Sequence, residues 1–233
     1  MHVLTDIPFH VDRNELFERL HLGKDSDFLQ ELHSLADQAD AVGKPKLIYD
    51  EVLIDNVDQD GIRVGGIRFA SRVMAKNLEK TDRIFPYVCT CGVELDSLSV
   101  PSTDDFGRFG LELIKEMALR QATIALAERI RVEVSLEKTS TMNPGSGDRS
   151  LWPIEEQRPL FKLLGSIETA IGVHLTDSFL MLPNKSVSGF YYKTDKEFHN
   201  CQLCKREHCP NRQKTFDSEL WRERAMGYAA ETT

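Results

Sequence analysis

The most constraining feature of this sequence is a long helical pattern that covers residues 104–134. Its central part reads GLELIKEMALRQATIALAERI and is rich in residues with high helix propensity. Ser102 or Thr103 precedes it as a candidate cap. Apolar side chains recur along it at Phe106, Phe109, Leu113, Met117, Ile124 and Leu126. We therefore expect one long helix that forms the spine of the fold.

The segments on either side of this helix mix short helices and short strands without regular alternation. Helices are predicted at 12–20 (capped by Asp12 or Asn14), 24–45, 73–78, 154–164, just before Gly172, and 216–229. Strands are predicted at 49–55, 61–71, 84–90, 174–182 and 186–192, the last two as a hairpin around residues 183–185. Residues 139–153 are predicted to be a loop, because they are rich in Gly, Pro and Ser. The fold class expected is α+β: a twisted, largely antiparallel sheet with packed helices, one of them long.

Composition narrows the possible partners and the compartment. The formal net charge is −8, and the basic residues are scattered, whereas nucleic-acid binding depends on clustered Lys and Arg. We therefore expect no nucleic-acid partner. No apolar run reaches the roughly 18 residues of a membrane span, and the N-terminus lacks a signal-peptide pattern. The sequence thus predicts a cytoplasmic protein, in which thiols stay reduced.

Three of the five cysteines, Cys201, Cys204 and Cys209, lie close together at C-x2-C-x4-C spacing. In a reducing compartment such spacing indicates metal or redox chemistry rather than disulfides. Three thiolates fit either a tetrahedral zinc site or a [4Fe–4S] cluster, each of which needs a fourth ligand. The candidates for that ligand are Cys89, Cys91, His199 and His208.

The pair Cys89 and Cys91 has an alternative interpretation. Both residues lie where a predicted buried strand ends and a short helix begins. One of them would then be a core residue and the other would cap the helix, where the helix N-terminus would stabilise a thiolate.

The second half of the chain resembles a known family. The segments NPGSGDRSLWPIEEQRPLFKLLG (143–165) and IGVHLTDSFLMLPNKSVSGFYY (171–192) are similar to the activation (reactivation) domain of cobalamin-dependent methionine synthase. Free-standing versions of that domain also tend to end in C-x2-C-x4-C-x2-R, which here is Cys201, Cys204, Cys209 and Arg212. In the first half of the chain, the best point of resemblance is FPYVCTCGVELDSL (85–98).

The resemblance implies a function in cobalamin repair. The family binds S-adenosylmethionine (SAM) and presents its methyl group to cob(II)alamin that has lost activity, while a low-potential electron donor supplies the electron. The cobalamin is carried by the partner, a methionine synthase or another corrinoid protein. The chain would be an accessory component of that methyltransferase and would carry no catalytic residue of its own, because the two cofactors supply the bond chemistry.

The resemblance also implies the ligand-binding residues. The loop Asn143-Pro144-Gly145-Ser146-Gly147 corresponds to the family's SAM loop, Glu128 to an acidic residue on the long helix, and Tyr191 to an aromatic residue near the ligand. The sequence departs from the family at two positions, where Thr141 and Ser146 replace an Arg and a Tyr. Arg149 or Arg158 could replace the missing positive charge.

Two further expectations concern the domain boundaries and the alternative functions. We expect a domain like the methionine synthase activation domain over residues 1–197, followed by a Cys-rich segment with a short helix over 198–233. The alternative function is an iron–sulfur or zinc binding module that acts as an electron-transfer or docking partner of a corrinoid protein without binding SAM. A third interpretation is a redox sensor whose cysteines are oxidised.

Overall fold

The computed structural model describes residues 1–23, 26–134, 138–147, 151–194, 198–209 and 212–225. Its centre is strand β6 (Arg83–Thr90), seven of whose eight residues are buried. One edge of β6 pairs with β2 (Lys46–Tyr49) and β3 (Val52–Asp58), and the other pairs with β10 (Ser186–Lys193). Burial on both faces explains why the segment reads as a continuous apolar run.

The remaining strands extend this eight-stranded sheet on both sides of β6. Beyond β2 lies β1 (His2–Leu4), and beyond β3 lie β4 (Gly61–Val64) and β5 (Ile67–Ala70). On the other side, β7 (Thr139–Met142) pairs with β10. Every pairing is antiparallel. The sheet therefore confirms the predicted α+β class.

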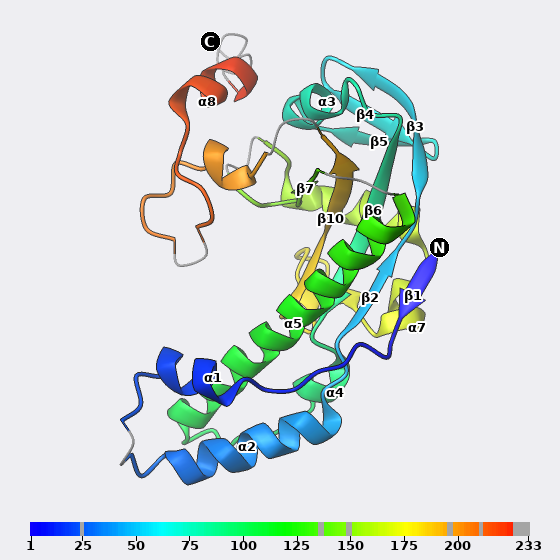
Figure 1. Cartoon of the computed structure of the whole chain (residues 1–233). Helices are drawn as coiled ribbons and strands as arrows, with labels where there is room; N and C mark the ends of the chain where they lie inside the picture. The colour runs from blue at the N-terminus through cyan, green and yellow to red at the C-terminus, as the bar shows by residue number, and fades with distance from the viewer. Residues whose placement is uncertain (24–25, 135–137, 148–150, 195–197, 210–211, 226–233) are drawn as a thin grey trace.

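Helix α5 (Asp105–Val134) covers one face of the sheet with its C-terminal half (Figure 1). Its buried residues Ala122, Leu126 and Ile130 recur every four positions and pack on the sheet residues Leu47, Tyr49, Phe85, Tyr87 and Cys89. The N-terminal half continues past the sheet to a second cluster. There it packs against α1 (Arg13–Arg19), α2 (Leu29–Val42) and α4 (Val93–Asp96).

The opposite face of the sheet is covered by α3 (Arg72–Leu78), α6 (Gln157–Leu164) and α7 (Ile167–Ile171). A short 3-10 helix (Ile154–Glu156) leads into α6. Trp152, Tyr192, Phe69 and Phe190 are the largest fully buried side chains of this third cluster. Phe198 and Leu203 belong to it too, so the Cys-rich segment is packed against the main core. That segment contains the 3-10 helix η2 (Asn200–Leu203) and ends in α8 (Ser218–Ala225).

Two sequence-based expectations about this region were wrong. Residues 139–142, predicted to be loop, form strand β7, because pairing with β10 satisfies their backbone and buries Ser140 and Met142. The segments 174–182 and 186–192 do not form a hairpin. His174–Leu175 (β8) instead pairs with Met181–Leu182 (β9), and β10 inserts between β6 and β7. No helix in the described part of the chain is long and apolar enough to cross a membrane.

Candidate functional site

The loop that resembles the family's SAM loop begins where β7 ends. Pro144 is buried, and Gly145 and Gly147 have positive φ angles of 75° and 88°, which favour glycine. The Gly145 amide donates to the carbonyl of Trp152 (2.8 Å), and the Ser146 amide donates to the carbonyl of Asn143 (3.1 Å). The loop is therefore a defined turn, tied to the start of the segment that leads to α6.

Asn143 joins this loop to the sheet. Its side-chain nitrogen donates to the hydroxyl of Tyr87 on β6 (2.7 Å) and to the carbonyl of Ser188 on β10 (2.9 Å). Tyr87 is buried, and burial raises the pKa of its hydroxyl well above the usual range, so the group stays protonated. Tyr87 was not among the residues that the sequence singled out.

Tyr191 lies on the α5 side of the sheet, and Tyr192 lies on the opposite side, as the alternation of a strand requires. The ring of Tyr191 is half-buried and sits 5.9 Å from that of Tyr87, and burial raises the pKa of its hydroxyl. In the β7–β10 ladder Tyr191 is opposite Thr141. Thr141, Asn143, Tyr191 and Tyr87 are thus gathered at one corner of the sheet, which we call the loop corner.

Glu128 lies on a face of α5 that does not point toward the loop corner. It lies on the exposed side of α5 with Ile124 and Val132, opposite the side that Leu126 and Ile130 bury.

Of the two arginines expected to supply the missing positive charge, only Arg158 lies among the described residues. Arg158 stands on α6, over the ring of Phe179 and 3.8 Å from Asp177. Helix α6 packs on the face of the sheet opposite Tyr191. Arg149 lies outside the described residues.

Cys89 and Cys91 are both fully buried. Burial raises the pKa of the Cys91 thiol to about 12 and raises that of Cys89 further. Asp96 also raises the pKa of Cys91. The expectation of a stabilised thiolate at the start of the four-residue helix α4 was therefore wrong, because burial removes the hydration that a charged thiolate needs.

The other three cysteines lie far from this pair. Strand β10 begins opposite Thr90, beside Cys91, and runs for eight residues, about 25 Å, before the chain reaches the Cys-rich segment. Figure 1 shows η2 and α8 beyond one end of β10 and α4 near the other. The structure therefore does not bring Cys89 or Cys91 to the tail cysteines.

Cys201, Cys204 and Cys209 are free and half-buried in a loop that curls around Arg212. The Arg212 guanidinium donates to the carbonyls of Cys201 (3.4 Å), Cys204 (3.3 Å), Lys214 (3.3 Å) and Arg206. Among the described residues, no group of three or more His, Cys, Asp or Glu side chains is arranged to hold a metal ion. The described thiols are therefore not gathered into the zinc or iron–sulfur site that the spacing predicts.

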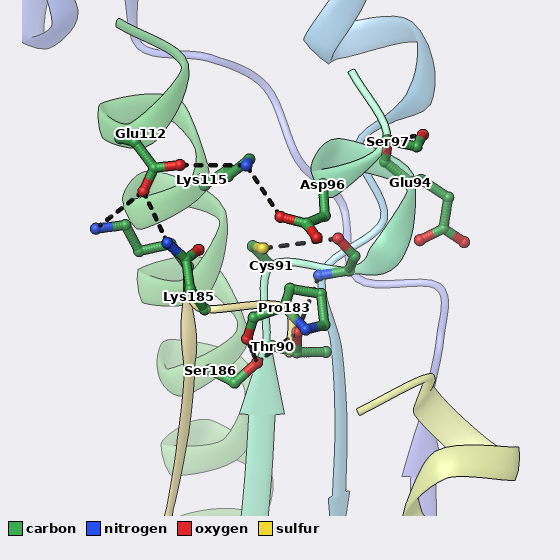
Figure 2. A network of polar contacts seen from close by, with 12 residues as sticks. Thr90, Cys91, Glu94, Asp96, Ser97, Glu112, Lys115, Pro183, Lys185 and Ser186 are labelled. Carbon is green, nitrogen blue, oxygen red and sulfur yellow. Dashed lines mark hydrogen bonds and ion pairs between the residues drawn. The ribbon is translucent and has the colours of Figure 1, made fainter. Parts of the chain in front are cut away.

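A polar network lies at the end of β6 near Cys91 (Figure 2). The buried Lys115 on α5 binds Asp96 (3.0 Å) and Glu112 (3.2 Å), and Glu112 also accepts from Asn184 (3.2 Å) and lies 3.5 Å from Lys185. Burial alone would lower the pKa of Lys115, but the hydrogen bonds to the two carboxylates outweigh it and raise the pKa. The network fastens α5 to α4 and to the turn before β10.

Comparison with known proteins places this geometry in context. Residues 67–214 match the family described as vitamin B12 dependent methionine synthase, activation domain. Among solved structures, the fold is similar to that of the MetH reactivation domain bound to AdoHcy, with a TM-score of 0.62 and 17% sequence identity. The similarity covers 85% of this chain and 80% of that one. The matched residues include β7, the loop corner, β10 and the Cys-rich segment as far as Lys214.

Proposed function

Because this chain belongs to the family of vitamin B12-dependent methionine synthase activation domains, we propose that it binds SAM and reactivates a corrinoid protein. The partner would be a methionine synthase or a related protein that carries the cobalamin. The chain would act on it in trans as a separate factor. The reaction would be the reductive methylation of cob(II)alamin, with the electron coming from a low-potential donor. The observation that carries the proposal is that the family match includes the whole loop corner.

The residues of the loop corner fit part of the ligand. SAM supplies an activated methyl group on a positively charged sulfur. The half-buried ring of Tyr191 can attract that charge through its π face, and the glycines of the loop let backbone groups approach closely. Thr141 offers a hydroxyl where the family has an Arg, so the ligand carboxylate has no charged partner at that position. We therefore expect weaker SAM binding than an Arg-containing site would give.

Calorimetry with SAM and with S-adenosylhomocysteine tests this proposal. Titrations of the wild type and of Tyr191→Ala, each alone and with a corrinoid partner, should show binding that the substitution weakens at least fivefold. Absence of binding by the wild type in both conditions would reject the SAM function. Binding that is equal in the two proteins would instead remove Tyr191 from the site.

The Cys-rich segment supports a second proposal, an iron–sulfur or zinc module that serves electron transfer or docking. The C-x2-C-x4-C spacing favours it, and the arrangement of the described thiols disfavours it. Anaerobic purification followed by metal analysis and visible absorption decides the matter. Stoichiometric iron with sulfide, or stoichiometric zinc, lost in Cys204→Ser would support a module. A metal-free protein would reject it.

A further inference from the structure

We propose that Tyr87 is a positioning residue for the ligand loop and acts through Asn143. This inference rests on the proposed SAM function and deepens it. The two side chains lie 56 positions apart in sequence, and their hydrogen bond is 2.7 Å long. Tyr87 is on the central strand β6, the most buried strand of the sheet, whereas Asn143 is the first residue after β7. Their contact ties the beginning of the loop to the buried centre of the sheet.

The hydrogen bonds of Asn143 fix the orientation of its amide. A side-chain amide has two N–H donors, and here one faces the Tyr87 hydroxyl and the other faces the Ser188 carbonyl. The carbonyl of Ser188 can only accept, so the nitrogen must face it. The Asn143 side-chain oxygen then points elsewhere and takes no hydrogen bond from any described residue.

Gly189 makes this arrangement possible. It stands opposite Tyr87 in the β6–β10 ladder, directly beneath the path of the Asn143 side chain. A Cβ at this position would lie 2.3 Å from the Met142 carbonyl oxygen and 2.6 Å from the Asn143 side-chain nitrogen. Both separations are too short for real contacts. The glycine therefore leaves the gap through which Asn143 reaches across β10 to β6.

The consequence is a pre-organised acceptor at the loop corner. Because its nitrogen is held at two points, the half-buried Asn143 presents its oxygen without losing rotamer freedom when a ligand binds. The chemistry it suits is an N–H donor of the ligand, which SAM carries on both its amino acid and its adenine. Because Thr141 stands where the family has an Arg, this neutral hydrogen bond would contribute a larger share of the binding free energy. Removing the Tyr87 hydroxyl would leave Asn143 held only by the Ser188 carbonyl, which loosens the amide and so weakens binding without touching the ligand directly.

The test compares Tyr87→Phe with a matched control, Tyr49→Phe. Tyr49 is the direct neighbour of Tyr87 in the β2–β6 ladder, is equally buried, and donates its hydroxyl to Glu133 (2.8 Å) on α5. Both changes remove one buried hydroxyl and should lower the thermal midpoint similarly. Calorimetry with SAM should show affinity reduced about tenfold in Tyr87→Phe and within twofold of wild type in Tyr49→Phe. Equal affinities in the two variants would overturn the inference.

A double-mutant cycle separates positioning from a general structural effect. If Tyr87 acts through Asn143, then Tyr87→Phe should cause no further loss of SAM affinity in an Asn143→Ala background. Additive losses would show that Tyr87 acts independently and would overturn the assigned role.

A second readout needs no ligand. Amide hydrogen exchange at Gly145 and Ser146 should speed up in Tyr87→Phe and stay unchanged in Tyr49→Phe. If the wild type fails to bind SAM while the exchange changes as expected, the proposed function falls and the anchoring of the loop stands. Unchanged exchange in Tyr87→Phe would reject the anchoring itself.

Discussion

The five cysteines fall into two chemically different sets. Cys89 and Cys91 are buried thiols that stay protonated, whereas Cys201, Cys204 and Cys209 are half-buried in a surface loop. Thiol reagents attack accessible thiolates, so burial and a raised pKa both protect the first pair. The two sets should therefore be separable by their reactivity.

We expect a thiol-specific disulfide reagent at pH 8 to label three cysteines rapidly and the other two only after unfolding. Mass spectrometry of the labelled peptides identifies which residues react, and Cys91→Ala should remove one of the slow sites. Rapid labelling of Cys89 or Cys91 in the folded protein would contradict the burial described here.

At this scale the sequence was informative about local features and silent about distant pairs. Asp12 was predicted as a helix cap, and its side chain does accept from the Glu15 amide (3.0 Å), a bond between residues three apart. The partnership of Tyr87 with Asn143 depends on strand pairing, to which no local pattern points. Gly189, in the motif SVSG, was the only trace of it in the sequence, since a strand glycine often marks a close approach of another group.

The Cys-rich loop is an element organised around one side chain. The Arg212 guanidinium bonds to backbone carbonyls from both arms of the loop, and Leu203 anchors it in the core. Guanidinium–carbonyl bonds are charge-assisted and fix several carbonyls at once. The shape of the loop thus depends on Arg212.

Arg212→Ala should increase proteolysis and amide exchange across residues 201–209, with a local cost of about 1–3 kcal/mol. The matched control is Arg206→Ala, which removes an exposed arginine side chain from the same loop while keeping the backbone carbonyl that Arg212 binds. Equal exchange rates in the two variants would show that Arg212 does not organise the loop.

Helix α5 is fastened by the network around Lys115. Replacing a buried, paired lysine leaves its carboxylate partners without a counter-charge. Because Asp96 and Glu112 are partly exposed, water can compensate in part. Lys115→Met, which keeps the apolar stem, should destabilise the protein by about 1–3 kcal/mol in urea denaturation. The exposed Lys76, paired with Glu79, is the control: Lys76→Met should cost at most about 0.5 kcal/mol. Similar costs for both would contradict the role of burial.

The elements predicted well were those with strong hydrophobic periodicity or with a clear residue that ends a helix. The long helix, α3 and α7 with its left-handed Gly172 match the expectations closely. Strands β2 and β7 were missed, because four residues are too few to show alternation and the Gly- and Pro-rich loop obscures β7. The predicted hairpin was wrong because the tertiary fold determines which strands pair. A turn-like sequence between two β-prone segments does not show that those two segments pair with each other.

For the whole molecule, buried neutral acids predict how stability depends on pH. Cys89, Cys91, Tyr49, Tyr87 and Tyr192 all have pKa values raised chiefly by burial. Unfolding lets each ionise at its ordinary pKa, about 8.5 for a thiol and about 10 for a tyrosine. Above those values the folded state holds more protons than the unfolded state, so the free energy of unfolding falls as pH rises.

We therefore expect stability to be insensitive to these groups below about pH 8 and to fall increasingly between pH 8.5 and 12. Each group adds a slope of up to about 1.4 kcal/mol per pH unit. Urea midpoints measured at pH 7.5, 9 and 10 check this. Cys91→Ala removes one of the titrating groups, so the slope of the unfolding free energy against pH should become shallower by up to about 1.4 kcal/mol per pH unit. A midpoint that does not change up to pH 10 would refute the expectation.

The α+β fold class was predictable because it depends only on which types of element the chain contains. The order of the strands in the sheet was not predictable. Nothing in the sequence indicates that β2 and β3, which are consecutive, pair with the same edge of β6, or that β10 separates β6 from β7. The loop corner follows from that order. Its members were therefore named from the sequence only where the family resemblance supplied them.

Helix α5, about 45 Å long, is shared by two hydrophobic clusters. Its first half completes the cluster built by α1, α2 and α4, and its second half covers the sheet. A shift or rotation of this continuous helix would expose apolar surface in both clusters, because each cluster packs on a different part of it. We therefore expect the N-terminal helices and the sheet to unfold together, in one transition, in urea denaturation.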